Sequence, residues 1–277
     1  MSKEKIHKFA VRTLSGLFLA AAVIGAALWS PVSYGVLLLV IAAGSLWEFY
    51  RLCERTDSSP QKFLGMAIGI GTLLFYFTLV LCGGGDITLP PTLLMALAPL
   101  VCIVELYRKS DHPIRNIAVT VTGTVYVAYP LALLFTLPLV FGPASYAPEL
   151  FLWFIFMVWG NDVFAYLVGV TCGRHRLFER ISPNKSWEGF FGGVAGAVGI
   201  GLLAGHLLSQ SLWLWGCMGL VVAVTGVLGD LVESMFKRSA NLKDSGNILP
   251  GHGGFLDRFD ALLLSTPFVF FLYALAV

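Results

Sequence analysis

The segment from Ser234 to Asp260 carries the side chains best suited to chemistry. It reads S-M-F-K-R-S-A-N-L-K-D-S-G-N-I-L-P-G-H-G-G-F-L-D-R-F-D, and it combines lysines and arginines with aspartates in an otherwise apolar chain. Cationic side chains suit phosphate groups, and carboxylates suit a divalent metal ion. The segment therefore predicts a metal-assisted phosphoryl or nucleotidyl transfer site where the chain meets the membrane surface.

Two further carboxylates, Asp230 and Glu233, precede this segment in an apolar stretch. A spacing of three places them on one face of a helix, and that face continues to Ser234 and Lys237. Ionisable residues inside membrane-spanning helices are costly and usually functional. We expect a metal ion here, because Mg2+ usually takes one or two protein carboxylates and leaves positions for phosphate oxygens. An internal Glu–Lys ion pair is the structural alternative.

Asp257 and Asp260 repeat the spacing of three at the start of the last apolar stretch. Acidic residues in the first turn of a helix also complement its dipole, which is the structural alternative here. The glycine-rich turn before them favours a functional role, because its backbone N–H groups would face an anion. His252, within that turn, is expected to bind phosphate or shape the loop, since a phosphate monoester needs little deprotonation near neutral pH.

A second polar segment, S-P-N-K-S-W-E-G, covers residues 182–189. Ser182, Asn184 or Ser186 can cap the following helix, and Glu188 suits its first turn. Lys185 opposes the helix dipole unless an anion lies nearby, and a triphosphate would supply one.

Asp162 lies inside the apolar stretch W-G-N-D-V-F-A-Y. It is expected either to bind a metal ion or to orient Lys185 or the triphosphate. Glu48 and Glu105 lie near the ends of two other apolar stretches, where snorkelling or pairing with Arg51 or Arg108 would explain them.

The elements that position these residues are transmembrane helices. Of the 277 residues, 57% are hydrophobic and 12% are charged, whereas soluble domains carry about 25% charged residues. Apolar runs of about 18 to 25 residues predict an all-α polytopic membrane protein with about nine transmembrane helices. We expect a single integral membrane domain over residues 1–277, with the catalytic motifs in residues 150–277. The expected spans are 12–29, 34–50, 63–82, 91–107, 116–141, 150–172, 187–208, 211–236 and 259–277.

The basic residues predict the orientation of the helices. All 18 Lys and Arg residues lie in, or at the edges of, alternate linkers along the chain. By the positive-inside rule these linkers are cytoplasmic, so the N-terminus is expected inside and the C-terminus outside. The two longest polar loops, 173–186 and 237–258, are then both cytoplasmic, and the reaction should use a cytosolic reagent.

Several other patterns are absent or ambiguous. The five cysteines are scattered and form no C-x-x-C pair, so they indicate neither a disulfide framework nor a zinc site. The P-loop motif G-x-x-x-x-G-K-[ST] is absent. Three G-x-x-x-G pairs lie in the span 187–208, and they are compatible with packing inside the chain or with dimerisation. These pairs are 189/193, 192/196 and 201/205.

The motif segment resembles that of the phosphatidate cytidylyltransferases, the CDP-diacylglycerol synthases. The pattern S-x-F/M-K-R-x4-K-D-x-G-x2-L-P-x-H-G-G-F-x-D-R-F-D is matched across about a tenth of the chain. The stretches 161–166 and 182–189 resemble the other polar segments of that family. The matched positions are Ser234, Lys237, Arg238, Lys243, Asp244, Gly246, Pro250, His252, Gly253, Gly254, Asp257, Arg258 and Asp260.

This resemblance implies transfer of CMP from CTP to phosphatidate with Mg2+, by a homodimer in the bacterial inner membrane whose active site faces the cytoplasm. The implied catalytic residues are Asp230, Asp257, Lys237, Arg238 and Lys243. The implied substrate-binding residues are Ser182, Lys185, Ser234, Asp244, His252, Gly253, Gly254 and Arg258. The implied metal ligands are Asp230 and Asp257, with Glu233, Asp260 and Asp162 as further candidates for the same ion or a second cation.

Two other functions compete with this one. A related CTP-dependent lipid transferase, such as a CDP-archaeol synthase or a polyprenol kinase, would share much of the active-site chemistry. A transporter of a phosphorylated solute should show inverted repeats and charges near the membrane midplane. The chain shows no repeat, and its charges gather at one face, so the transferase is favoured. Membrane lipids are expected partners, and nucleic acid is not.

Overall fold

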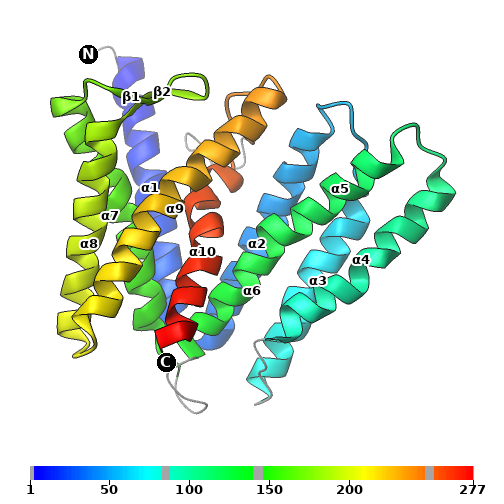
Figure 1. The fold of residues 1–277 in the computed structure, drawn as a ribbon, viewed down its shortest axis with the longest axis horizontal. Coiled ribbons are helices and arrows are strands. Elements are labelled where there is room, and N and C mark those ends of the chain that lie inside the picture. Colours follow the sequence, from blue (N-terminus) through cyan, green and yellow to red (C-terminus); the bar gives the residue numbers. More distant parts are fainter. Residues whose placement is uncertain (1–2, 83–87, 140–145, 247–252, 277) are drawn as a thin grey trace. The chain divides into compact units, whose positions relative to one another are not determined.

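A computed structural model of the chain describes residues 3–82, 88–139, 146–246 and 253–276, with side chains from residue 13 onward except those of Pro90 and Leu139. Helices make up most of these residues (Figure 1). Within the described ranges, eight helices are long and apolar enough to cross a membrane, and a shorter apolar helix covers Thr13–Trp29. The all-α polytopic fold expected from the apolar runs is confirmed.

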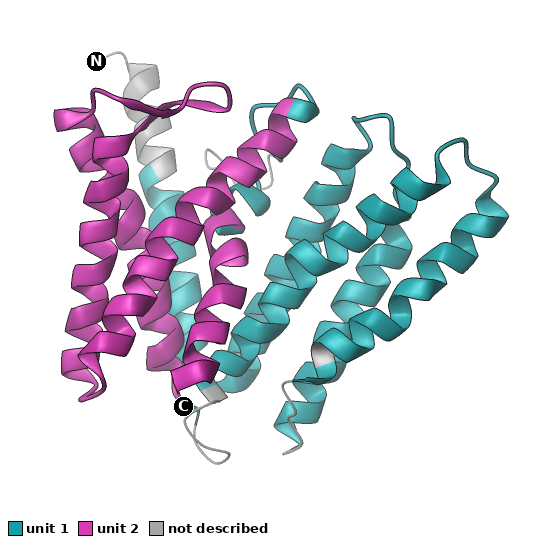
Figure 2. Cartoon of the chain, viewed as in Figure 1, with its two compact units in different colours: residues 1–146, 239–259 teal, residues 147–238, 260–277 magenta. Residues whose placement is uncertain are grey.

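The chain forms two compact units, coloured separately in Figure 2. Unit 1 comprises Met1–Tyr146 and Ser239–Phe259, and unit 2 comprises Ala147–Arg238 and Asp260–Val277. The motif segment therefore contributes to both units, and each is described by itself. The expectation of one integral membrane domain stays a prediction.

Within its described residues, unit 1 contains six α-helices and the start of α10. Ser30 and Ser33 cap α2 reciprocally, since each side-chain oxygen accepts a hydrogen bond from the other's backbone N–H, at 3.0 and 3.1 Å. A π-helical segment (Thr124–Ala128) joins α5 to α6, so the expected span 116–141 is one helical run over Pro113–Thr136. The helices are α1 (Lys3–Trp29), α2 (Pro31–Cys53), α3 (Lys62–Leu81), α4 (Leu89–Arg108), α5 (Pro113–Gly123) and α6 (Tyr129–Thr136).

Buried aromatic residues hold the centre of unit 1 together. The rings of Phe77 on α3 and Phe135 on α6 meet edge to face with centroids 5.0 Å apart. Tyr34 on α2 is fully buried, and its hydroxyl donates to the carbonyl of Leu134 at 2.8 Å. Because its hydroxyl has this acceptor, the tyrosine can be buried without an unsatisfied polar group. The contacts fasten α2 and α3 to α6.

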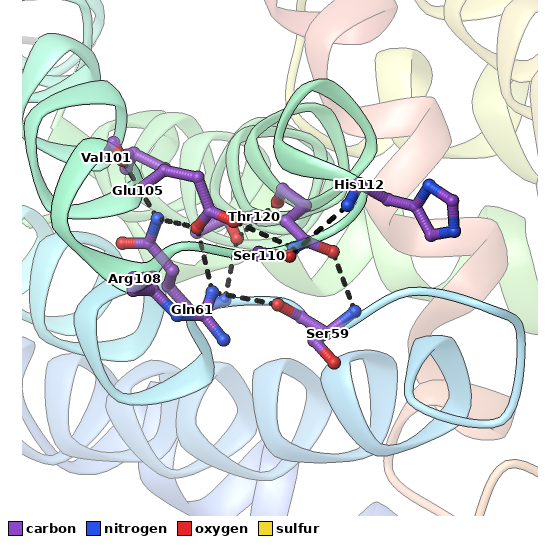
Figure 3. Close-up of polar contacts among 9 residues, drawn as sticks. Ser59, Gln61, Val101, Glu105, Arg108, Ser110, His112 and Thr120 are labelled. Carbon is purple, nitrogen blue, oxygen red and sulfur yellow. Dashed lines mark hydrogen bonds and ion pairs between the residues drawn. The ribbon is translucent and has the colours of Figure 1, made fainter.

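A buried polar cluster joins the ends of α3, α4 and α5 (Figure 3). Glu105 on α4 is 3% exposed. Its carboxylate accepts hydrogen bonds from Gln61 at 2.6 Å, Asn116 at 2.8 Å and Arg108 at 2.9 Å. The expected pairing of Glu105 with Arg108 is confirmed. The carboxylate does not snorkel, because several donors compensate its burial.

Unit 2 consists of four helices and a β-ribbon that the sequence analysis did not predict. The helices are α7 (Pro148–Cys172), α8 (Trp187–Leu207), α9 (Leu212–Ser239) and most of α10 (Leu256–Ala276). Strands β1 (Arg176–Phe178) and β2 (Ser182–Ser186) pair antiparallel between α7 and α8. Ser186, at the end of β2, caps α8 by accepting a hydrogen bond from the Gly189 N–H at 3.1 Å. Of the three expected capping residues, Ser186 is the one that caps.

The glycine pairs of α8 pack against neighbouring helices of unit 2. A Cβ on Gly189 would lie 2.8 Å from the carbonyl of Ala165 on α7, and Gly205 faces the ring of Trp215 on α9. The other glycines of the three pairs likewise contact α7 or α9. Packing inside the chain therefore accounts for all three pairs. Dimerisation stays a prediction.

Candidate active site

Three carboxylates gather in unit 2, two from α9 and one from α10. Asp230, Glu233 and Asp260 each place an oxygen within 4.8 Å of the others. The spacing of three puts the first two on one face of α9. Gly229 lets α10 approach that face closely, since a Cβ on it would lie 2.7 Å from the carbonyl oxygen of Asp260. Sequence spacing and this close helix contact together build the cluster.

Two lysines pair with the cluster. Glu233 is fully buried and forms an ion pair with Lys237 one turn later on α9. The Nζ of Lys185 lies 2.5 Å from a carboxylate oxygen of Asp230. The Glu–Lys pair named as the structural alternative is therefore present. The anion beside Lys185 in this structure is a carboxylate of the chain, whereas the sequence analysis expected a triphosphate.

The cluster suits a divalent cation. Its oxygen ligands are the type that Mg2+ prefers, and Mg2+ commonly uses only one or two protein carboxylates. Three carboxylates against two lysines leave an excess of negative charge when all are ionised, and Glu233 and Asp260 are buried at 0% and 8% exposure. Because buried charge is costly without compensation, a bound cation would stabilise this arrangement.

A cavity of about 590 Å³ adjoins the Lys185–Asp230 pair. Its charged lining residues are Asp162 on α7, Lys185 on β2 and Asp230 on α9, and the rings of Tyr166 and Phe190 also line it. Asp162 is exposed to this space. The structure thus brings Asp162, Lys185 and Asp230 together at one cavity from three different elements. Ser182 lies at the start of β2, paired with Phe178, and is not among the residues that line the cavity.

Asp257 lies in unit 1, where it organises the start of α10. Its Oδ2 accepts hydrogen bonds from the Ser245 N–H at 3.0 Å, the Ser245 hydroxyl at 2.9 Å and the Gly254 N–H at 2.9 Å. Asp257 therefore has a structural role at the N-terminal end of α10, where an acidic side chain also complements the helix dipole. Gly253 has a φ of +80°, in the region that favours glycine. The sharing of one metal ion by Asp230 and Asp257 stays a prediction.

Most of the remaining candidate residues described in the structure are exposed. Lys243, Asp244 and Arg258 are exposed in unit 1, and Arg238 is exposed at the end of α9. The Ser234 hydroxyl donates to Asp230 Oδ1 at 3.3 Å. His252 lies outside the described residues, as does Pro250 of the motif.

Sequence reasoning missed a second cavity, of about 330 Å³, in unit 1. It lies between α2 and the motif segment, and Glu48 is one of its lining residues. The expectation that Glu48 snorkels or pairs with Arg51 is wrong. The residue is 2% exposed and hydrogen-bonds the motif segment. An acid inside an apolar span was the signal that marked it.

The comparisons with known proteins agree with this geometry. A family model described as the cytidylyltransferase family matches residues 10–276. A Rickettsia bellii protein named phosphatidate cytidylyltransferase is 30% identical over 285 residues, which cover 99% of this chain and 94% of that protein. A Mycobacterium leprae protein of the same name is 43% identical over 157 residues, and one from Bacillus subtilis is 48% identical over 122 residues. These last two matches span only 50% and 45% of the relatives' own lengths.

Proposed function

Because the chain belongs to the cytidylyltransferase family, we propose that it transfers CMP from CTP to phosphatidate. An oxygen of the phosphatidate phosphate forms a bond to the α-phosphorus of CTP. The bond from that phosphorus to the bridging oxygen breaks, and pyrophosphate leaves with the bonding electrons. The products are CDP-diacylglycerol and pyrophosphate. The names of these relatives favour this reaction over that of a CDP-archaeol synthase or a polyprenol kinase.

The observation that carries the proposal is the carboxylate cluster of unit 2 beside the cavity that Lys185 lines. Transfer to a phosphorus atom is catalysed mainly by positioning and by neutralising the charge on phosphate oxygens. Lys185 is placed to neutralise a phosphate in the cavity, and Lys237 and Arg238 follow on α9. Asp230, Glu233 and Asp260 would hold Mg2+ in unit 2. That Asp257 is also a ligand stays a prediction from the sequence. A bound Mg2+ supplies neutralisation of the triphosphate charge.

The chain is a multi-pass membrane protein. We propose that it lies in the inner membrane with the N-terminus and the motif loops in the cytoplasm, because every basic residue lies in or at the edge of alternate linkers. CTP would arrive from the cytosol, and phosphatidate would enter from the bilayer with its tails in lipid. A homodimer is part of this proposal.

The test is pyrophosphate release by the purified protein in detergent, with CTP, phosphatidate and Mg2+, each omitted in turn. We expect release to need all three, to prefer CTP over ATP and to stop when EDTA removes the metal. Release with a different lipid phosphate would assign the chain to a related transferase. No release with any lipid phosphate, from a folded sample, would contradict the proposal and favour a transporter.

A further inference from the structure

A buried carboxylate on α2 holds the motif segment from far away in the sequence. Glu48 Oε2 accepts a hydrogen bond from the Leu256 N–H at 2.9 Å and from the Ser245 hydroxyl at 3.1 Å. These partners are 208 and 197 positions away along the chain, and they lie on both sides of the glycine-rich turn. One carboxylate oxygen thus ties both ends of the turn to α2.

Ser245 links this carboxylate to Asp257. Its hydroxyl lies 3.1 Å from Glu48 Oε2 and 2.9 Å from Asp257 Oδ2. A hydroxyl has one proton to donate, so it can serve either carboxylate, while the Ser245 N–H bonds Asp257 in both cases. The position of Asp257 therefore depends on a chain of contacts that begins at Glu48.

The backbone at two motif glycines packs directly against the same carboxylate. A Cβ on Gly246 would overlap Glu48 Oε1, and a Cβ on Gly254 would overlap Oε2. One turn earlier on α2, a Cβ on Gly44 would lie 2.6 Å from the ring of Phe255. Positions 44 and 48 share one face of the helix. This face of α2 therefore packs closely against the residues that precede α10.

Stability alone does not explain a carboxylate at this position. A buried charge costs free energy, and well-packed apolar residues usually replace such groups without loss. Within the described parts of the chain Glu48 forms no ion pair, and its Oε1 has no hydrogen-bond partner. Glu105 provides the contrast, since three side chains satisfy it and none of them belongs to the motif segment.

We propose that Glu48 is a positioning residue for the transfer reaction, which holds the turn before α10 so that Asp257 is correctly placed. This inference rests on the proposed function. By this proposal, a residue from the apolar first half of the chain helps to position the site. Partners that orient a metal ligand or a reacting group typically contribute about 10–100-fold to activity or metal affinity.

The test compares Glu48→Gln and Glu48→Ala with the matched variant Glu105→Gln in unit 1. We expect Glu48→Ala to lower kcat about 10–100-fold and to raise the Mg2+ concentration needed for half-maximal rate. Glu48→Gln keeps an acceptor oxygen and should recover part of that loss. Glu105→Gln should lower the thermal midpoint but leave kcat and the Mg2+ requirement unchanged, because its contacts lie away from the motif.

Hydrogen exchange gives a readout that does not depend on turnover. In Glu48→Ala the peptide containing Gly253–Asp257 should exchange faster than in the parent protein, because the Leu256 N–H loses its acceptor. In Glu105→Gln the exchange of that peptide should be unchanged. Equal exchange of this peptide in all three proteins would overturn the proposal, even if activity differs.

A double variant tests the contact itself, and Glu48→Gln covers the case in which Glu48→Ala folds poorly. Gly246→Ala should impair the parent protein strongly, because its Cβ needs the space of Glu48 Oε1. In the Glu48→Ala background the same substitution should cost much less, as residues in contact behave non-additively. Additive losses, or identical kinetics for Glu48→Gln and Glu105→Gln in an active parent, would refute the role. A parent inactive with CTP and phosphatidate would instead refute the proposed function.

Discussion

At the scale of single residues, two carboxylates of the site form ion pairs with lysines of the same chain. Glu233 pairs with Lys237 in the helix interior, and Asp230 pairs with Lys185 at the edge of the cavity. These two pairs differ in burial, since Glu233 is fully buried whereas the Asp230 side chain is 42% exposed. The Lys185–Asp230 pair is only partly buried, so separating it to admit a phosphate should cost little, since exposed ion pairs contribute about 0–1 kcal/mol.

Asp230→Asn should abolish turnover while leaving the fold intact. The substitution keeps the shape of the side chain and removes only a half-exposed ion pair, so the loss of stability should stay near 1 kcal/mol or below. Removing a residue that supports a metal ligand typically lowers activity roughly 10–100-fold, and removing the ligand itself should lower it further. Asp257→Asn should also abolish turnover and leave a folded, membrane-inserted protein. Pyrophosphate release and a thermal melt of each variant check this expectation.

Asp57→Asn serves as the control for both variants. The Asp57 side chain is 95% exposed and lies at the end of a 3.8 Å contact with Arg115. The activity of the Asp57→Asn variant should match that of the parent protein. Near-normal turnover in Asp230→Asn or Asp257→Asn would contradict the metal assignment of that residue.

At the scale of elements, the site depends on how closely α10 approaches α9. The backbone of Asp260 lies against Gly229, the residue immediately before Asp230. Because no side chain separates the two helices there, carboxylates from both can share one cluster. The β-ribbon also contributes to the site, since β2 carries Lys185 to Asp230.

Gly229→Ala should push α10 away from α9 and disturb the cluster. The added Cβ meets backbone atoms, which cannot rotate away, so we expect a stability loss of about 1–3 kcal/mol. Turnover should fall as well, because Asp260 moves with the backbone of α10. Thermal unfolding in detergent and pyrophosphate release measure the two effects.

Gly199→Ala is the matched comparison, because a Cβ at that position of α8 has nothing within 4 Å. It should change neither stability nor rate. If Gly229→Ala proved equally silent, the close approach of α9 and α10 would not be what assembles the carboxylates.

At the scale of the whole molecule, function depends on which side of the membrane the motif loops face. From the basic linkers we expect both of them to lie in the cytoplasm, where CTP is found. Two exposed native cysteines report on this orientation. Cys82 follows α3 at the end opposite the basic Lys62, and Cys172 ends α7 next to the basic loop that begins after Gly173.

Labelling of single-cysteine variants with a membrane-impermeant maleimide tests the orientation. In intact spheroplasts Cys82 should react, and Cys172 should react only after the membrane is permeabilised. The expected reason is the positive-inside distribution of Lys and Arg. The reverse pattern would place the motif loops outside, away from CTP, and would exclude the proposed reaction in cells.

The sequence by itself determined the helices, their approximate ends and the residues of the motif. Apolar length and charge distribution are local properties, so they can be read directly along the chain. The spacing of Asp230 and Glu233 likewise predicted their shared face, which the structure confirms. The β-ribbon was missed because its residues lie in a short polar loop without the alternating pattern of a strand.

Only the tertiary structure decided which distant residues meet. Nothing local to Lys185 marks Asp230 as its partner, and nothing local to Glu48 marks Ser245 or Leu256. An apolar helix is hydrophobic on several faces, so its sequence does not say which face will contact which neighbour. Close contacts at glycines such as Gly229 select those faces, and they turn scattered carboxylates into a site.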